Sequence, residues 1–119
     1  MTNKQRKPIR RVSTARQKQL QEYAKLKRAW HERNRYCAVC RQRDILCGPV
    51  DPHHSMGRIH GLLLDTRLWI ALCRKHHNMV MSDPAWARCH NLLPPVGWYN
   101  DINRADEWSK ILNGIEIPK

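Results

Sequence analysis

The fold is decided by the stretch from position 37 to position 81, CAVCRQRDILCGPVDPHHSMGRIHGLLLDTRLWIALCRKHHNMVM. Near its ends stand two pairs of metal-ligand side chains, Cys37-x2-Cys40 and Cys73-x2-His76. Two ligands three positions apart can share one tight turn and face a single tetrahedral ion, and Zn2+ takes thiolate and imidazole ligands. The spacing therefore predicts a closed structural zinc site made by these four residues. The alternative is a reduced, buried cysteine pair beside unrelated histidines.

The cysteine count also favours a metal site over disulfide bonds. The chain has five Cys, an odd number, and no apolar signal-peptide segment follows Met1, so we expect a reducing, cytoplasmic compartment. Cys47 and Cys89 have no partner at the same spacing and are expected to be packed free thiols. Cys47 remains a competing fourth ligand if His76 is needed elsewhere. Structural zinc contributes on the order of 10 kcal/mol to the folding of small domains, which a thin hydrophobic core requires.

Positive charge is concentrated in the first third of the chain. The 119 residues carry a net charge of +12, and positions 1–35 hold 12 Lys or Arg against two Glu, while the remainder is nearly balanced. A field of this sign favours a polyanionic partner. The alternative for positions 1–12 is a tail that only solubilises the protein. No apolar run approaches the roughly 20 residues of a membrane span, so we expect no membrane partner.

Apolar periodicity and turn residues predict one small α+β domain. Thr14 and Gln17 match a capping box before a basic helix over 15–33, whose apolar stripe includes Tyr23 and Trp30. Strands are expected at 50–55 and 68–72, a mobile loop at 57–61, and helices at 73–81, 85–90 and 103–113. We expect a disordered basic tail (1–12) and one domain (13–119), divided into a basic helix (13–35), a zinc-bound core (36–90) and a C-terminal loop and helix (91–119).

Three histidines lie between and beside the zinc pairs. His53 and His54 are adjacent on a predicted strand, so their side chains point to opposite faces and should do different work. His77 directly follows the second zinc pair. The order of elements through this region is strand, loop, strand, helix. Other histidines, His31 and His90 among them, are expected to be surface or packing residues.

At this point the sequence resembles the HNH endonuclease family, and most of all its small zinc-stabilised phage and prophage members. The resemblance covers roughly positions 12–90 and its joint spacing is more specific than any lone motif. It implies a small zinc-stapled ββα-metal (His-Me finger) core, preceded by a basic helix and followed by further helices. The residues that carry it are Cys37-x2-Cys40, His53-His54-Ser55-x-Gly57-Arg58, Leu63-Leu64-Asp65, Trp69, Cys73-x2-His76-His77 and Asp83-Pro84-x-x-Ala87-Arg88.

The resemblance also implies roles for individual residues. His54 would be the general base, and His53 and His77 would ligate a catalytic divalent cation such as Mg2+ or Mn2+, which polarises the phosphate and stabilises the leaving 3'-oxygen. Asp65 is the nearest polar candidate to orient the base, although it could equally cap the turn into the strand. The expected DNA contacts are Arg58, Arg74, Lys27 and Arg28, with solvated surface charge as the alternative for Arg58 and Arg74.

Two positions depart from the family pattern, since Met81 stands where many members carry a further histidine and no Asn occurs in the LWIAL segment. Water or Asp83 could complete the metal site. The sequence therefore predicts a metal-dependent DNA endonuclease of low intrinsic sequence specificity, phage-encoded and acting in the host cytoplasm beside packaging or recombination proteins. The alternative is a non-catalytic zinc-knuckle DNA-binding or adaptor protein on the same fold. RNA as the substrate is a third reading.

Overall fold

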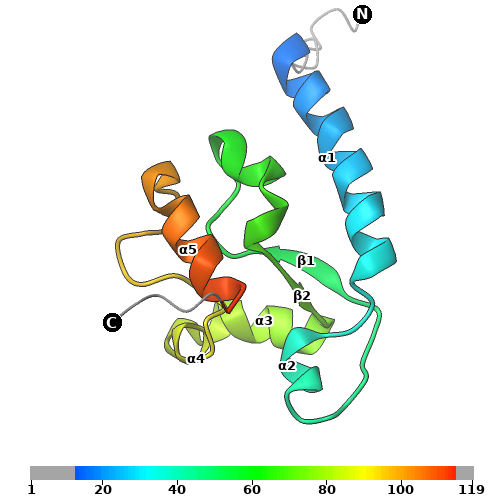
Figure 1. Cartoon of the computed structure of the whole chain (residues 1–119), viewed down its shortest axis with the longest axis vertical. Coiled ribbons are helices and arrows are strands. Elements are labelled where there is room, and N and C mark those ends of the chain that lie inside the picture. Colours follow the sequence, from blue (N-terminus) through cyan, green and yellow to red (C-terminus); the bar gives the residue numbers. More distant parts are fainter. Residues whose placement is uncertain (1–12, 115–119) are drawn as a thin grey trace, which may run out of the picture.

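The computed structural model describes residues 13–114, so the tail predicted at 1–12 and the last five residues lie outside the description. Its centre is a two-stranded antiparallel sheet made by β1 (Asp51–His54) and β2 (Trp69–Leu72). In the register of this sheet His54 lies opposite Trp69. Helix α3 (Arg74–Ser82) begins directly after β2 and packs against both strands (Figure 1). The predicted small α+β fold is confirmed at this level.

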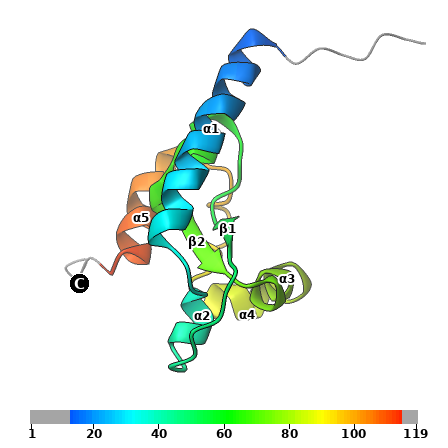
Figure 2. The ribbon, with the colours of Figure 1, turned by 90° about the vertical axis from the view of Figure 1, so that its right-hand side faces the viewer.

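The basic helix predicted near the N-terminus is α1 (Thr14–Arg33). Its predicted capping box is wrong, because Ser13 is the N-cap and accepts a hydrogen bond from the Arg16 backbone N–H. The apolar stripe becomes buried only toward the C-terminal end, where Trp30 lies in the core. Figures 1 and 2 show the N-terminal turns of α1 projecting beyond the rest of the molecule. Among residues 13–114, no helix combines the length and the apolar character needed to cross a bilayer.

The connections between these elements contain short helical turns. The connection between α1 and β1 begins with α2 (Ala38–Arg41), a single helical turn that was not predicted. The segment between β1 and β2 was expected to contain a mobile loop, and instead it forms two 3-10 turns, η2 (His60–Leu64) and η3 (Thr66–Leu68). The side chain of Asp65 caps η3 by accepting a hydrogen bond from the Arg67 backbone N–H. This segment is therefore ordered by local hydrogen bonds.

The C-terminal part covers the sheet from the side opposite α1 (Figure 1). Helix α4 (Pro84–Cys89) begins at a proline in its first turn, as predicted, with Asp83 as its N-cap. The last predicted helix is divided into a 3-10 turn, η4 (Ile102–Arg104), and α5 (Ala105–Leu112). Asp101 caps the start of η4 by accepting a hydrogen bond from the Asn103 backbone N–H.

Two hydrophobic clusters hold these elements together. The first surrounds the cysteine pairs and includes Trp30, Trp69 and Val80, and the second lies under α5 around Trp108 and Met56. Trp30, Trp69 and Trp108 are all buried in these clusters. Ser55 is fully buried beside the second cluster, where its hydroxyl donates to the Leu68 carbonyl at 2.6 Å and accepts from Trp108 Nε1 at 2.9 Å. The residue that follows β1 is thereby tied to both η3 and α5.

Candidate metal centre and histidine pocket

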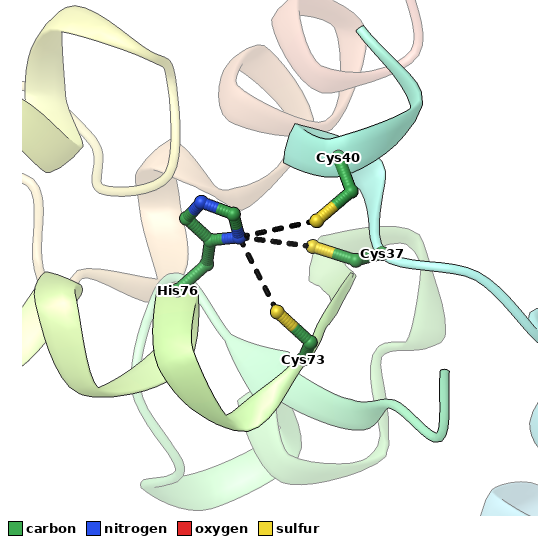
Figure 3. A group of neighbouring side chains, drawn as sticks. All are labelled: Cys37, Cys40, Cys73 and His76. Carbon is green, nitrogen blue, oxygen red and sulfur yellow. Dashed lines mark hydrogen bonds between the residues drawn. The ribbon is translucent and has the colours of Figure 1, made fainter. Parts of the chain in front are cut away.

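The four predicted zinc ligands come together at one point. The ligand atoms of Cys37, Cys40, Cys73 and His76 all lie within 4.8 Å of one another, and all four residues are buried (Figure 3). Local structure explains this convergence, because Cys37 is the N-cap of α2 and Cys73 is the N-cap of α3. Each pair therefore spans the first turn of a helix, where positions three apart lie on the same face.

The spacing of these atoms fits a tetrahedral zinc ion. His76 Nδ1 lies 3.5 Å from Cys37 Sγ, 3.5 Å from Cys40 Sγ and 3.3 Å from Cys73 Sγ. In a tetrahedron with Zn–S near 2.3 Å and Zn–N near 2.1 Å, the nitrogen and sulfur ligands are separated by about 3.6 Å. The four residues could hold a metal ion, in the donor set and geometry of a closed Cys3His structural site. Within residues 13–114, this is the one such cluster of His, Cys, Asp or Glu ligands.

The electrostatics of the cluster also call for a cation. Burial, followed by the neighbouring thiols of Cys37 and Cys73, raises the pKa of Cys40 to about 12. Burial lowers the pKa of His76, which keeps the imidazole neutral as a metal ligand must be. Three buried thiolates are unfavourable on their own because their negative charges are removed from water. A bound divalent ion offsets this cost, and its charge deprotonates the thiols that coordinate it. The imidazole is further held by a stacked Trp86 ring, 6.0 Å away.

Cys47 does not join the cluster, which leaves His76 as the fourth ligand. Cys47 instead supports the site through its backbone, because its carbonyl accepts a hydrogen bond of 2.9 Å from the Cys37 N–H. Its side chain is half-buried against the first hydrophobic cluster. Cys89 is exposed at the end of α4, so only Cys47 fits the expectation of a packed thiol.

The three histidines singled out by the sequence line a second site, an open pocket of about 330 Å³. We call it the histidine pocket. His53 and His54 reach it from β1 and His77 from the first turn of α3, while Arg58 comes from the loop after β1. The remaining lining residues are Ile59, Met81, Tyr99 and Asn100.

His53 is fixed by a hydrogen bond to the C-terminal part of the chain. Its Nε2 donates to the Leu92 carbonyl at 2.7 Å, so Nδ1 carries the free lone pair. The ring lies 5.4 Å from the His77 ring in an edge-on arrangement. Burial lowers the pKa of His53 to about 4, and burial also lowers the pKa of His77, which nearby Asp51 partly restores. Both imidazoles are therefore neutral near pH 7, the state in which histidine binds a metal.

His54 lines the same pocket and also meets α1. Its Nε2 lies 3.2 Å from the Tyr23 hydroxyl, and its ring packs 5.1 Å from the Trp69 ring. The predicted division of the two adjacent histidines between different environments is thus observed. Burial, and then the charge of Arg58, lowers the pKa of His54 to about 4, and Lys27 contributes in the same direction. An imidazole in this environment is neutral and available to accept a proton.

The other predicted site residues do not line this pocket. Asp65 does not line it, because its carboxylate is held by Arg67 at 2.7 and 2.9 Å and caps η3. Arg74 is largely exposed and forms an ion pair of 3.4 Å with Asp51. Arg28 lies exposed on α1. Asp83, offered as a completing metal ligand, is instead the N-cap of α4.

Three residues that line or support the pocket were not predicted as functional from the sequence, namely Tyr23, Tyr99 and Asn100. Tyr23 was placed in the apolar stripe of α1, and helical spacing does not reveal that its hydroxyl reaches His54. Tyr99 and Asn100 follow the Pro-rich loop, and Asn100 is bound to the turn after β1 through a 2.9 Å hydrogen bond from its N–H to the Met56 carbonyl. The positive φ of Gly57 is the related local signal, because Asn100 approaches the backbone at this glycine.

Comparison with protein-family models, with curated proteins and with solved structures finds no match to this chain. The functional argument therefore rests on the residues and their geometry.

Proposed function

We propose that the protein is a metal-dependent endonuclease of the HNH type that hydrolyses DNA phosphodiester bonds. The observation that carries the proposal is the histidine pocket, where three neutral imidazoles from β1 and α3 lie together with Arg58 from the loop after β1. The Cys3His cluster holds the start of α3 next to it. This combination supports a ββα-metal site with zinc in a structural role and a second, catalytic divalent cation in the pocket.

The chain's own residues can perform the required steps. Neutral His54 would take a proton from the attacking water, the work that an imidazole does well as a general base. His53, through Nδ1, and His77 would hold a divalent cation, which supplies charge stabilisation at the phosphate and the leaving 3'-oxygen. Two protein ligands leave positions for water and phosphate. Arg58, exposed at the edge of the pocket, would hold a phosphate oxygen through its guanidinium.

Affinity for DNA would come from the net charge of +12 and from the position of α1. The electrostatic effect of Lys27 on His54 shows that the positive charge of α1 reaches the pocket. A helix whose basic N-terminal turns project past the core (Figure 2) can contact backbone phosphates beyond the scissile one. Such contacts carry little sequence information, in keeping with low intrinsic specificity. Phage origin, and packaging or recombination proteins as partners, belong to the same proposal through the resemblance.

A second candidate is a zinc-containing DNA-binding or adaptor protein without catalysis. Met81 favours it, because this side chain is 82% exposed at the pocket where a third histidine ligand would strengthen metal binding. Within residues 13–114, His53 and His77 have no further His, Cys, Asp or Glu close enough to complete a three-ligand group. The two candidates share the zinc cluster and the positive charge, so turnover separates them.

The deciding experiment is plasmid nicking by the purified full chain with added Mg2+ or Mn2+. Wild type is compared with His54→Ala and with the control His90→Ala, since His90 is exposed and does not line the histidine pocket. We expect metal-dependent nicking in wild type and His90→Ala and none in His54→Ala. DNA affinity and zinc content, measured on the same samples, should be equal in all three.

Two outcomes would count against the proposal. DNA binding and one bound zinc without turnover, under any divalent cation, would favour the adaptor. Equal loss of binding and cleavage in His54→Ala would remove the assigned role of His54. Preferential cleavage of RNA over DNA in the same assay would keep the chemistry and change the substrate.

A further inference from the structure

Besides its positive charges, helix α1 carries one side chain, Tyr23, that contacts the proposed general base His54. The Tyr23 hydroxyl lies 3.2 Å from His54 Nε2, and the two rings are 5.6 Å apart. Trp69 packs against both, at 5.4 Å from the Tyr23 ring and 5.1 Å from the His54 ring. His54 is only 6% exposed, so these contacts leave its ring little freedom to turn.

We propose that Tyr23 is a positioning residue that fixes the tautomer and the orientation of His54. In this arrangement the Nε2–H of His54 donates to the phenolic oxygen of Tyr23, and Nδ1 keeps the lone pair that accepts a proton from water. The inference rests on the proposed function for its catalytic meaning. The hydrogen bond and the tautomer it selects can be tested in the resting protein.

The direction of this hydrogen bond follows from what a base requires. If the phenol donated to Nε2, the proton of the neutral imidazole would lie on Nδ1, and neither nitrogen would be free to accept another. If the phenol accepts, the bond persists when Nδ1 takes up a proton, and it becomes stronger because its donor is then charged. A tyrosine oxygen can accept in this way while its own proton remains in place.

The surroundings of Tyr23 keep its phenol neutral. Burial raises the pKa of Tyr23, opposed by the charge of Arg58 and assisted by that of Asp51. A neutral hydroxyl retains one proton to donate elsewhere and two lone pairs to accept with. The same helix would therefore bring positive charge for phosphate binding and a side chain that orients His54 to one pocket. The position of α1 would in this way set the orientation of the general base.

The test compares Tyr23→Phe with the control Tyr36→Phe. Phenylalanine keeps the ring packing against Trp69 and removes the hydroxyl alone, while Tyr36 is exposed and does not line the histidine pocket. The first readout is the 15N chemical shifts of His54 in the metal-free pocket with the zinc cluster loaded, assigned by the loss of these signals in His54→Gln. We expect the Nε2–H tautomer in wild type and Tyr36→Phe and a mixture of tautomers in Tyr23→Phe.

The second readout is how the effect of the substitution divides between kcat and KM. We expect Tyr23→Phe to lower kcat about 10- to 100-fold, the size of a hydrogen bond to a charged group, with KM nearly unchanged. A wild-type His54 with its proton on Nδ1 would overturn the inference, as would full kcat and an unchanged tautomer in Tyr23→Phe. If wild type shows no nuclease activity at all, the proposed function fails, and the tautomer comparison still decides whether Tyr23 fixes His54.

Discussion

At the scale of single residues, the cluster of Cys37, Cys40, Cys73 and His76 should determine whether the protein folds. We expect Cys37→Ser to lose the bound zinc and cooperative unfolding, because Cys37 is completely buried among the other ligands. Structural zinc contributes on the order of 10 kcal/mol, which is comparable with the whole stability of a small domain. Zinc content by elemental analysis and thermal unfolding by circular dichroism measure the two losses.

The control for this prediction is Cys89→Ser, which changes an exposed thiol outside the cluster. It should keep one zinc ion and the wild-type melting temperature. A folded Cys37→Ser protein with full zinc content would show that another side chain, such as Cys47, can replace the lost ligand.

The two buried histidines of β1 should make stability depend on pH. Burial lowers the pKa of both His53 and His54 from 6.5 to about 4. Between pH 6.5 and pH 4 the unfolded chain binds more protons than the folded one. The free energy of unfolding is therefore highest above the unfolded pKa and falls as the pH is lowered toward 4. Near pH 5.5, each histidine should reduce stability by about 1 kcal/mol.

Urea unfolding of the zinc-loaded protein, at pH 7.5 and at pH 5.5, measures this effect. The difference between the two pH values should be smaller by about 1 kcal/mol in His54→Gln than in wild type. Replacing the exposed His90 by Gln should leave the difference unchanged. Acid release of zinc affects all three proteins alike, so it cancels in the comparison. An undiminished pH difference in His54→Gln would contradict the prediction.

At the scale of elements, the sequence predicted what local patterns determine. β1, β2 and α3 lie within one or two residues of their predicted bounds, because the apolar run of β2 and the Asp-Pro that follows α3 act locally. The zinc ligands were predictable for the same reason. The start of α1 was misjudged by one capping residue, and η2 was missed because its 3-10 turn depends on packing against α1 and on Leu62 entering the second cluster.

Contacts between distant elements were beyond the reach of sequence patterns. Tyr23 meets His54 across 31 positions of the chain, and Asn100 meets the turn after β1 across more than 40. Helical spacing places Tyr23 on the inner face of α1 but does not say which side chain it faces. The same limit applies to Asp65, where one carboxylate could orient a base or cap a turn, and the structure places it in the cap.

The turn after β1 offers a prediction about how an element is positioned. Gly57 has φ of +96°, and a Cβ at this position would lie 1.9 Å from Asn100 Oδ1. We expect Gly57→Ala to lower the free energy of unfolding by about 1–3 kcal/mol, because backbone strain and a displaced Asn100 act together. Gly61→Ala is the matched control, since a Cβ there meets nothing within 4 Å. Urea denaturation measures both variants, and equal stabilities would show that the 99–100 segment moves aside without cost.

At the scale of the whole molecule, the elements that build the core differ from the helix that projects into solvent. The zinc cluster and the first hydrophobic cluster hold β1 and α3, α5 closes the second cluster through the Trp108–Ser55 hydrogen bond, and α1 extends outward with its positive charges. The histidine pocket lies where these parts meet, with residues from β1, α3 and the 99–100 segment.

The charge distribution therefore predicts which cations contribute to DNA affinity. Lys27 on α1 influences His54 directly, whereas Lys110 is exposed on α5, on the other side of the sheet (Figure 1). Each phosphate neutralised by the protein adds about 0.9 to the slope of log K against log salt concentration. Fluorescence anisotropy with a labelled duplex should show the slope falling by about one in Lys27→Gln and staying unchanged in Lys110→Gln. Equal slopes in both variants would show that Lys27 neutralises no phosphate and would contradict the DNA contact assigned to it, because each phosphate contact contributes its own part of the slope.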